Sequence, residues 1–152
     1  MRSLKVKSSI PDGQSHETSR KRLQKAYHAG CIFKKNSLLR DLRFRWGNDG
    51  ALCAEFFCTR KHQGYDDIAH GGVIAAIVDA SMTQCLMGHG IAGYTGELNV
   101  RYRTPVKLNA ATTLQTRLVG ARFDKMYQLE AIVTQEKKTC VTATSKFFKI
   151  SQ

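Results

Sequence analysis

The stretch that decides the fold is His70-Gly-Gly-Val-Ile-Ala-Ala-Ile-Val-Asp79-Ala-Ser-Met-Thr-Gln-Cys-Leu86. From Val73 to Val78 it is apolar or small on nearly every side, which predicts a buried helix rather than a surface one. The start of a helix has free backbone N–H groups and the positive end of the dipole. Gly71 and Gly72 at that position let a ligand approach the backbone closely. The pattern therefore indicates a site for an oxyanion.

Asp79 is a carboxylate two turns into this apolar helix, where a hydrophobic residue or a surface charge is ordinary. Gly71 and Asp79 are separated by about 12 Å along a straight helix axis. Catalytic groups that share one substrate carbonyl must converge to about 3 Å from it. If both residues act on one carbonyl, Asp79 must come from a second subunit with an antiparallel helix. A twofold dimer supplies that arrangement twice.

Alternating and turn-forming residues around the helix predict strands. Leu42, Phe44 and Trp46 alternate with charged residues, so we expect a half-buried strand from about Asp41. The turn signal Asn48-Asp49-Gly50 leads into a second strand. The elements expected around the central helix are a helix at 14–28, strands at 41–46, 51–60, 94–104, 111–119, 126–135 and 139–150, and turns at 122–125 and 137–138. One helix wrapped by one curved antiparallel sheet is an α+β architecture.

The ends of the chain differ from its centre in composition. Residues 1–12 are expected to be disordered, and residues 1–30 form a basic N-terminal extension with a short peripheral helix, followed by a single domain at 31–152. The formal net charge is +12, but residues 61–100 carry one basic and four acidic side chains. Basic flanks attract coenzyme A phosphates or nucleic acid, or serve only solubility. Aromatic residues do not interleave with the basic ones as in a stacking platform, which disfavours nucleic acid as a partner.

The five cysteines form no C-x-x-C pair and no metal-ligand spacing. We therefore expect reduced thiols, a cytoplasmic protein and no metal site, with Cys85 in the core rather than acting as a nucleophile. We find no apolar run long enough to cross a bilayer and no signal-peptide centre in the first residues, so no membrane partner is expected.

Two stretches resemble a known family. Gln63-Gly-Tyr-Asp-Asp-Ile-Ala-His70-Gly-Gly-Val-Ile-Ala-Ala-Ile-Val-Asp79 resembles the active-site segment of hotdog-fold acyl-CoA thioesterases, and Glu97-Leu-Asn-Val-Arg-Tyr-Arg-Thr-Pro-Val-Lys107 resembles the strand after the helix. The chain is most similar to the phenylacetyl-CoA thioesterase-like and 4-hydroxybenzoyl-CoA thioesterase-like group, from about residue 31 to residue 150. The resemblance implies the hotdog fold, an antiparallel sheet wrapped around one long central helix.

The resemblance also implies an activity and its residues. Asp79 is then the general base or nucleophile on a thioester, the Gly71 N–H is the oxyanion donor, and Thr83 positions the attacking water. His70, Gly72 and Gln63 are the implied substrate-binding residues, although His70 is expected mainly to cap the helix. The implied substrate is an acyl-CoA, with no cofactor beyond the coenzyme A that it carries, and the implied assembly is a homodimer or homotetramer.

The chain departs from the family pattern at two places. Ala80 follows Asp79 where many similar proteins have Glu. Lys34 stands where a cysteine is common, and Asn36-Ser37-Leu38 lacks the usual proline. These differences leave a second hypothesis open, a non-catalytic hotdog protein that binds acyl-CoA. Arg101, Arg103 and Lys107 are candidates to hold coenzyme A phosphates in either case, although their spacing singles out none of them.

Overall fold

The computed structural model describes residues 13–35 and 42–151. Its elements in chain order are α1 (Gly13–Tyr27), α2 (Ile32–Lys35), β1 (Arg43–Trp46), β2 (Leu52–Phe56), the 3-10 helix η1 (Arg60–His62), α3 (Gly71–Gly88), β3 (Gly93–Tyr102), β4 (Thr112–Arg122), β5 (Met126–Gln135) and β6 (Lys138–Lys149). The expected disorder of residues 1–12, the strand start at Asp41 and the departures at 36–38 lie outside the described ranges.

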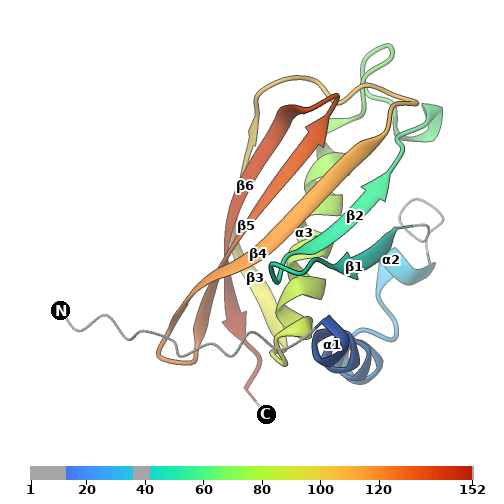
Figure 1. Ribbon diagram of the computed structural model, residues 1–152. Helices are drawn as coiled ribbons and strands as arrows, with labels where there is room; N and C mark the ends of the chain where they lie inside the picture. The colour runs from blue at the N-terminus through green and yellow to red at the C-terminus, as the bar shows by residue number, and fades with distance from the viewer. Residues whose placement is uncertain (1–12, 36–41, 152) are drawn as a thin grey trace.

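The six strands form one antiparallel sheet in the order β1-β2-β4-β5-β6-β3. Figure 1 shows the long helix α3 lying against one face of this curved sheet. Consecutive strands β4, β5 and β6 are neighbours, whereas β3 reaches the far edge because α3 crosses the sheet before it. The prediction of an α+β hotdog fold, with an antiparallel sheet around one central helix, is confirmed.

The turns follow local sequence chemistry, with one shift in position. Gly50 has a φ of 76° at the end of the β1–β2 turn, where glycine adopts the left-handed region without strain. Phe123 and Asp124 (φ 53° and 52°) turn β4 into β5 at the expected place. Glu136 and Lys137 (φ 48° and 63°) form the last turn, one residue before the expected position. Two successive positive φ values match the right-handed twist of a hairpin.

Strand β2 ends at Phe56, four residues before the predicted boundary. The reason is the lack of a partner: Phe56 pairs with Thr112, which is the first residue of β4. Beyond that point the chain turns into η1, where His62 Nδ1 accepts from the Thr59 N–H at 2.8 Å. The predicted strand therefore extended past the residues for which β4 supplies hydrogen-bond partners.

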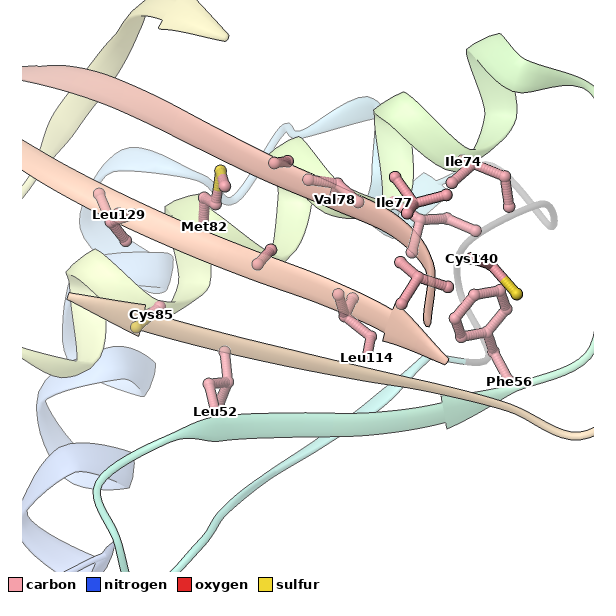
Figure 2. Close-up of a cluster of buried hydrophobic side chains, with 14 of the residues drawn as sticks. Leu52, Phe56, Ile74, Ile77, Val78, Met82, Cys85, Leu114, Leu129 and Cys140 are labelled. Atoms are coloured by element: carbon pink, nitrogen blue, oxygen red, sulfur yellow. The ribbon is translucent and has the colours of Figure 1, made fainter. Parts of the chain in front are cut away.

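The core lies between α3 and the sheet. Figure 2 shows Ile74, Val78 and Met82 of α3 on the side of the strands that carry Leu114 and Leu129. Burial is most complete in the second half of the helix, where every residue from Ser81 to Gly88 is buried. By length and composition α3 also resembles a membrane span, so our expectation of no such run was wrong, but most of the helix is packed inside this fold.

Helix α1 confirms the expected N-terminal helix and packs on the C-terminal half of α3. Its inward residues are His16, which is 1% exposed, and Leu23. The His16 ring stacks on Trp46 with centroids 4.3 Å apart, and its Nδ1 lies 3.0 Å from the Gly88 carbonyl oxygen. Because a carbonyl only accepts, Nδ1 carries the proton. A helix expected to lie at the periphery is thus anchored by one buried histidine.

Candidate functional site

The beginning of α3 leaves one backbone donor open. His70 is the N-cap residue, with φ −60° and ψ 129°, and its Nδ1 accepts from the Gly72 N–H at 3.0 Å. The predicted capping role of His70 is therefore confirmed. No acceptor among residues 13–35 and 42–151 pairs with the Gly71 N–H, which is the first helical donor. The structure leaves Gly71, rather than Gly72, able to donate to an oxyanion.

Tyr102 holds the other side of the Gly71 peptide. Its hydroxyl donates to the Gly71 carbonyl oxygen at 2.5 Å, and burial raises the pKa of this phenol. The phenol thus stays a hydrogen-bond donor at neutral pH. Sequence alternation alone did not indicate this contact between Tyr102 and the helix start. This hydrogen bond forms because Tyr102, the last residue of β3, lies beside Gly71, the first residue of α3.

A cavity of about 810 Å³ opens in front of this helix start. Gln63, His70 and Gly71 all line it, together with Tyr102 and Arg103. The loop that supplies Gln63 is fixed by a β-bridge between Gln63 and Ala69 and by the His70 N–H, which donates to the His62 carbonyl at 2.7 Å. Three of the predicted residues are therefore brought together here, whereas Gly72 is exposed and lies outside this lining.

Asp79 faces a different cavity, of about 470 Å³, whose walls come from α1, α2, β1 and α3. Its carboxylate oxygen Oδ1 accepts a hydrogen bond from Thr95 Oγ1 at 2.7 Å. Thr83 and Ala80 line the same cavity. A hydroxyl that donates to a carboxylate fixes its orientation and leaves its second oxygen for a water or a substrate.

Thr95 reaches Asp79 because of a β-bulge. The register between β3 and β6 shifts between Thr95 and Glu97. On either side of the shift, Thr95 and Leu98 are both half-buried on the inner face, although they are an odd number of residues apart. Strict period-two alternation from Leu98 would point Thr95 outward. Gly96 marks the bulge: a Cβ there would lie 2.2 Å from the Phe148 ring. That glycine was the signal in the sequence for this partner.

Two further side chains, Thr83 and His28, line the Asp79 cavity. Thr83 Oγ1 donates to the Asp79 backbone carbonyl at 3.1 Å, so its proton serves the helix and only its lone pairs remain for a water. His28 lines the cavity, and burial, with a smaller effect of Lys34, lowers the pKa of its imidazole. A neutral His28 imidazole thus lines the same cavity as the Asp79 side chain.

The predicted catalytic residues therefore lie in two cavities that share no lining residue. Gly71 and Asp79 belong to one continuous helix, so the expected separation of about 12 Å along its axis applies. Of the candidate phosphate-binding residues, Arg103 lines the Gly71 cavity and Lys107 an adjoining one. Within a single chain, Asp79 and the Gly71 N–H do not meet at one carbonyl.

The cysteines and other metal-binding side chains contribute no further centre in the described ranges. All five cysteines are free thiols. Cys85 is buried in the core, and burial raises its pKa to about 12, which confirms a packing residue rather than a nucleophile. No three His, Cys, Asp or Glu side chains among the described residues are grouped so that they would hold a metal ion.

Comparison with known proteins adds a family to this geometry. The thioesterase superfamily matches residues 67–127, from the loop before α3 to the start of β5. Acyl-coenzyme A thioesterase THEM4 of Mus musculus is 32% identical over 89 residues, which are 58% of this chain and 38% of the mouse protein. The chain thus spans well under half the length of that relative.

Solved structures share the architecture at low identity. The E. coli PaaI protein from the phenylacetic acid degradation operon has a TM-score of 0.72 and 10% identity, over 91% of this chain and 96% of PaaI. A hypothetical thioesterase from Streptococcus pneumoniae, solved with coenzyme A, has a TM-score of 0.68 and 18% identity, over 74% and 90% of the two chains. These likenesses show the fold alone. The chain has the hotdog fold, and its residues 67–127 match the thioesterase superfamily.

Proposed function

We propose that the chain is an acyl-CoA thioesterase whose active site is formed by two copies of the chain. The observation that carries this proposal is the distribution of two catalytic groups along α3. The Gly71 N–H has no partner among the described residues, and the Asp79 carboxylate is oriented by Thr95 in a separate cavity. An antiparallel pairing of two α3 helices brings each Gly71 to the partner's Asp79.

The surface of α3 supports such a pairing. Val73, Ala75 and Ala76 are apolar but only half-buried, although the sequence predicts full burial there. Strand β3 lies at the edge of the sheet, beside the beginning of α3. A second copy covering this half of the helix removes apolar surface from water, which favours association. We propose a homodimer, and a homotetramer as a further pairing of dimers.

The chemistry follows from these positions. A water oxygen attacks the thioester carbonyl while Asp79 accepts the water's proton, or Asp79 itself attacks and water then hydrolyses the acyl-aspartyl intermediate. The carbonyl oxygen becomes an oxyanion that the Gly71 N–H stabilises, a contribution of about 3 kcal/mol for one donor. The carbon–sulfur bond then breaks, and the coenzyme A thiolate leaves and takes up a proton. Five free thiols accord with a reducing compartment, and we propose the cytoplasm.

The decisive experiment uses two inactive variants. Asp79→Asn cannot accept a proton and should lower kcat by about a thousandfold. Gly71→Pro lacks the N–H, yet proline suits the first helical position, and the extended ψ of His70 suits a following proline. Release of free thiol from short, long and aromatic acyl-CoAs measures turnover. Glu130→Gln, a carboxylate-to-amide change on the exposed face of β5, is the matched control.

Mixing the two variants in equal amounts tests the shared site. If each site takes Gly71 from one subunit and Asp79 from the other, a mixed dimer has one intact site, and activity recovers to about a quarter of wild type after subunit exchange. No recovery, or sedimentation showing only folded monomers at micromolar concentration, contradicts the composite site. A wild-type protein that binds the acyl-CoAs without turnover supports instead the non-catalytic hypothesis raised by Ala80.

A further inference from the structure

The Asp79 cavity extends along α3 to Gln84, which lines its far part together with Arg20 and Glu17 of α1. Its apolar lining comes from Phe33 of α2, Leu42 just before β1 and Phe44 of β1. The rest of its lining is mostly polar. The cavity therefore offers a molecule that enters past Asp79 an apolar side to pack against and a polar group to meet farther in.

A chain of hydrogen bonds fixes the orientation of the Gln84 amide. Glu17 accepts from Arg20 Nε at 2.9 Å and from Nη2 at 2.6 Å, and Arg20 lowers the pKa of this carboxyl. Arg20 Nη1 then donates to Gln84 Oε1 at 2.8 Å. Because an arginine cannot accept, the atom that faces it must be the amide oxygen. The Gln84 nitrogen is thereby turned away from Arg20.

That nitrogen lacks an acceptor. Gln84 is 9% exposed, and its Nε2 pairs with no atom in the described ranges 13–35 and 42–151. Because Gln84 lines the cavity, a water or a ligand there can supply the acceptor for this donor. The charges agree: Arg20, Lys34 and Arg43 line this cavity against Glu17 and Asp79, an excess of one positive charge.

We propose that Gln84 selects acyl groups that carry an oxygen acceptor at their far end, with a terminal carboxylate as the strongest acceptor. This inference rests on the proposed thioesterase function and specifies its substrate class. Asp79 and Gln84 are about 7.5 Å apart along the helix axis, a length that an extended chain of about six carbons spans. The apolar lining contacts the methylene groups, and the Gln84 N–H donates to the terminal oxygen.

The test compares adipoyl-CoA with hexanoyl-CoA, which have equal chain length and differ in the terminal carboxylate. For wild type we expect kcat/KM to favour adipoyl-CoA by about tenfold, the effect of one hydrogen bond to a charged group. Gln84→Met keeps the length of the side chain but removes the donor, and should abolish this preference. Gln84→Glu still accepts from Arg20 but presents a carboxylate, and should reverse it. Gln115→Met on the exposed outer face of β4 should leave the ratio unchanged.

The preference is also measured without turnover, as the ratio of the Kd values of hexanoyl-CoA and adipoyl-CoA. Calorimetry in the Asp79→Asn background gives these two values. A tenfold ratio in Kd that Gln84→Met removes supports the inference even if wild type hydrolyses neither substrate, in which case only the proposed catalytic function fails. Hydrolysis of both substrates with equal kcat/KM, or a preference that survives in both Gln84 variants, overturns the inference and leaves the thioesterase proposal intact. Failure to bind either acyl-CoA overturns both.

Discussion

The two ends of α3 both use a histidine, but they use it in opposite ways. At the first end, His70 accepts from Gly72 and leaves the Gly71 N–H open beside a cavity. At the second end, the His16 Nδ1–H from another helix donates to the Gly88 carbonyl, and Trp46 stacks on this ring. The open end retains an unsatisfied donor for a ligand, whereas the closed end satisfies its acceptor and is buried. We infer that the first end serves chemistry and the second serves stability.

The largest test of this comparison is Gly88→Ala. A Cβ at Gly88 would lie 2.0 Å from Trp46 Cζ2, within the closed end. Overpacking of this kind costs about 3 kcal/mol, so we expect the thermal unfolding midpoint to fall by about 8 °C. Trp46→Phe in the same background makes room and should recover part of the loss. An unchanged midpoint in Gly88→Ala would show that the closed end is loosely packed.

The next effect concerns the positioning of Asp79 by Thr95. Thr95→Val keeps the shape of the side chain and removes the hydroxyl that donates to Oδ1. We expect kcat to fall by about tenfold with little change in stability, because this bond orients a reacting carboxylate rather than the core. Thr95→Ser should restore most of the rate, and Thr144→Val on the exposed face of β6 is the control. Full activity in Thr95→Val would separate Thr95 from the site.

The pH dependence of stability tests the closed end by another route. Burial, and then the nearby charge of His16, lowers the pKa of His89 to about 4. Its pKa in the unfolded chain is about 6.5, so between these values the unfolded state binds a proton that the folded state does not. His89 therefore contributes stability above pH 6.5 that is lost as the pH falls toward 4. We expect the drop in unfolding midpoint from pH 6.5 to 4.5 to be about 3 °C smaller in His89→Gln.

Carboxylates that are paired in the folded protein, Glu17 among them, lose their contribution at lower pH in wild type and variant alike. Comparing the pH dependence of the unfolding midpoint in wild type with that in His89→Gln removes this shared contribution. Equal slopes in wild type and His89→Gln would mean that His89 is solvated in the folded state, contrary to a buried closed end.

The smallest expected effect on stability is that of Gly71→Ala at the open end. Its Cβ would meet Tyr102 at 3.4 Å, an ordinary van der Waals contact. We expect the free energy of unfolding to change by less than about 0.5 kcal/mol, while thioester hydrolysis falls because a methyl group restricts the approach to the N–H. Chemical denaturation and thiol release measure the two properties. A stability loss as large as that of Gly88→Ala would remove the distinction between the two ends.

Much of the fold followed from local sequence chemistry. Apolar and small residues from Val73 predicted the central helix, His70 predicted its cap, and Asn48-Asp49-Gly50 predicted the first hairpin. These features involve residues that are neighbours along the chain, so their physics is visible in the sequence. The separation of Gly71 from Asp79 is also a local property, because it depends only on the helical rise per residue.

Other features depended on the tertiary structure. The bulge at Gly96 reverses the alternation of β3 and brings Thr95 to Asp79. The docking of α1 on α3 lets Arg20 orient the Gln84 amide. Both pairs join residues far apart in sequence, and their geometry depends on a register shift and on a helix contact that no period of the sequence encodes. The sequence by itself determined which residues are the candidates for the chemistry; only the packing of strands and helices decided which partner each of them meets.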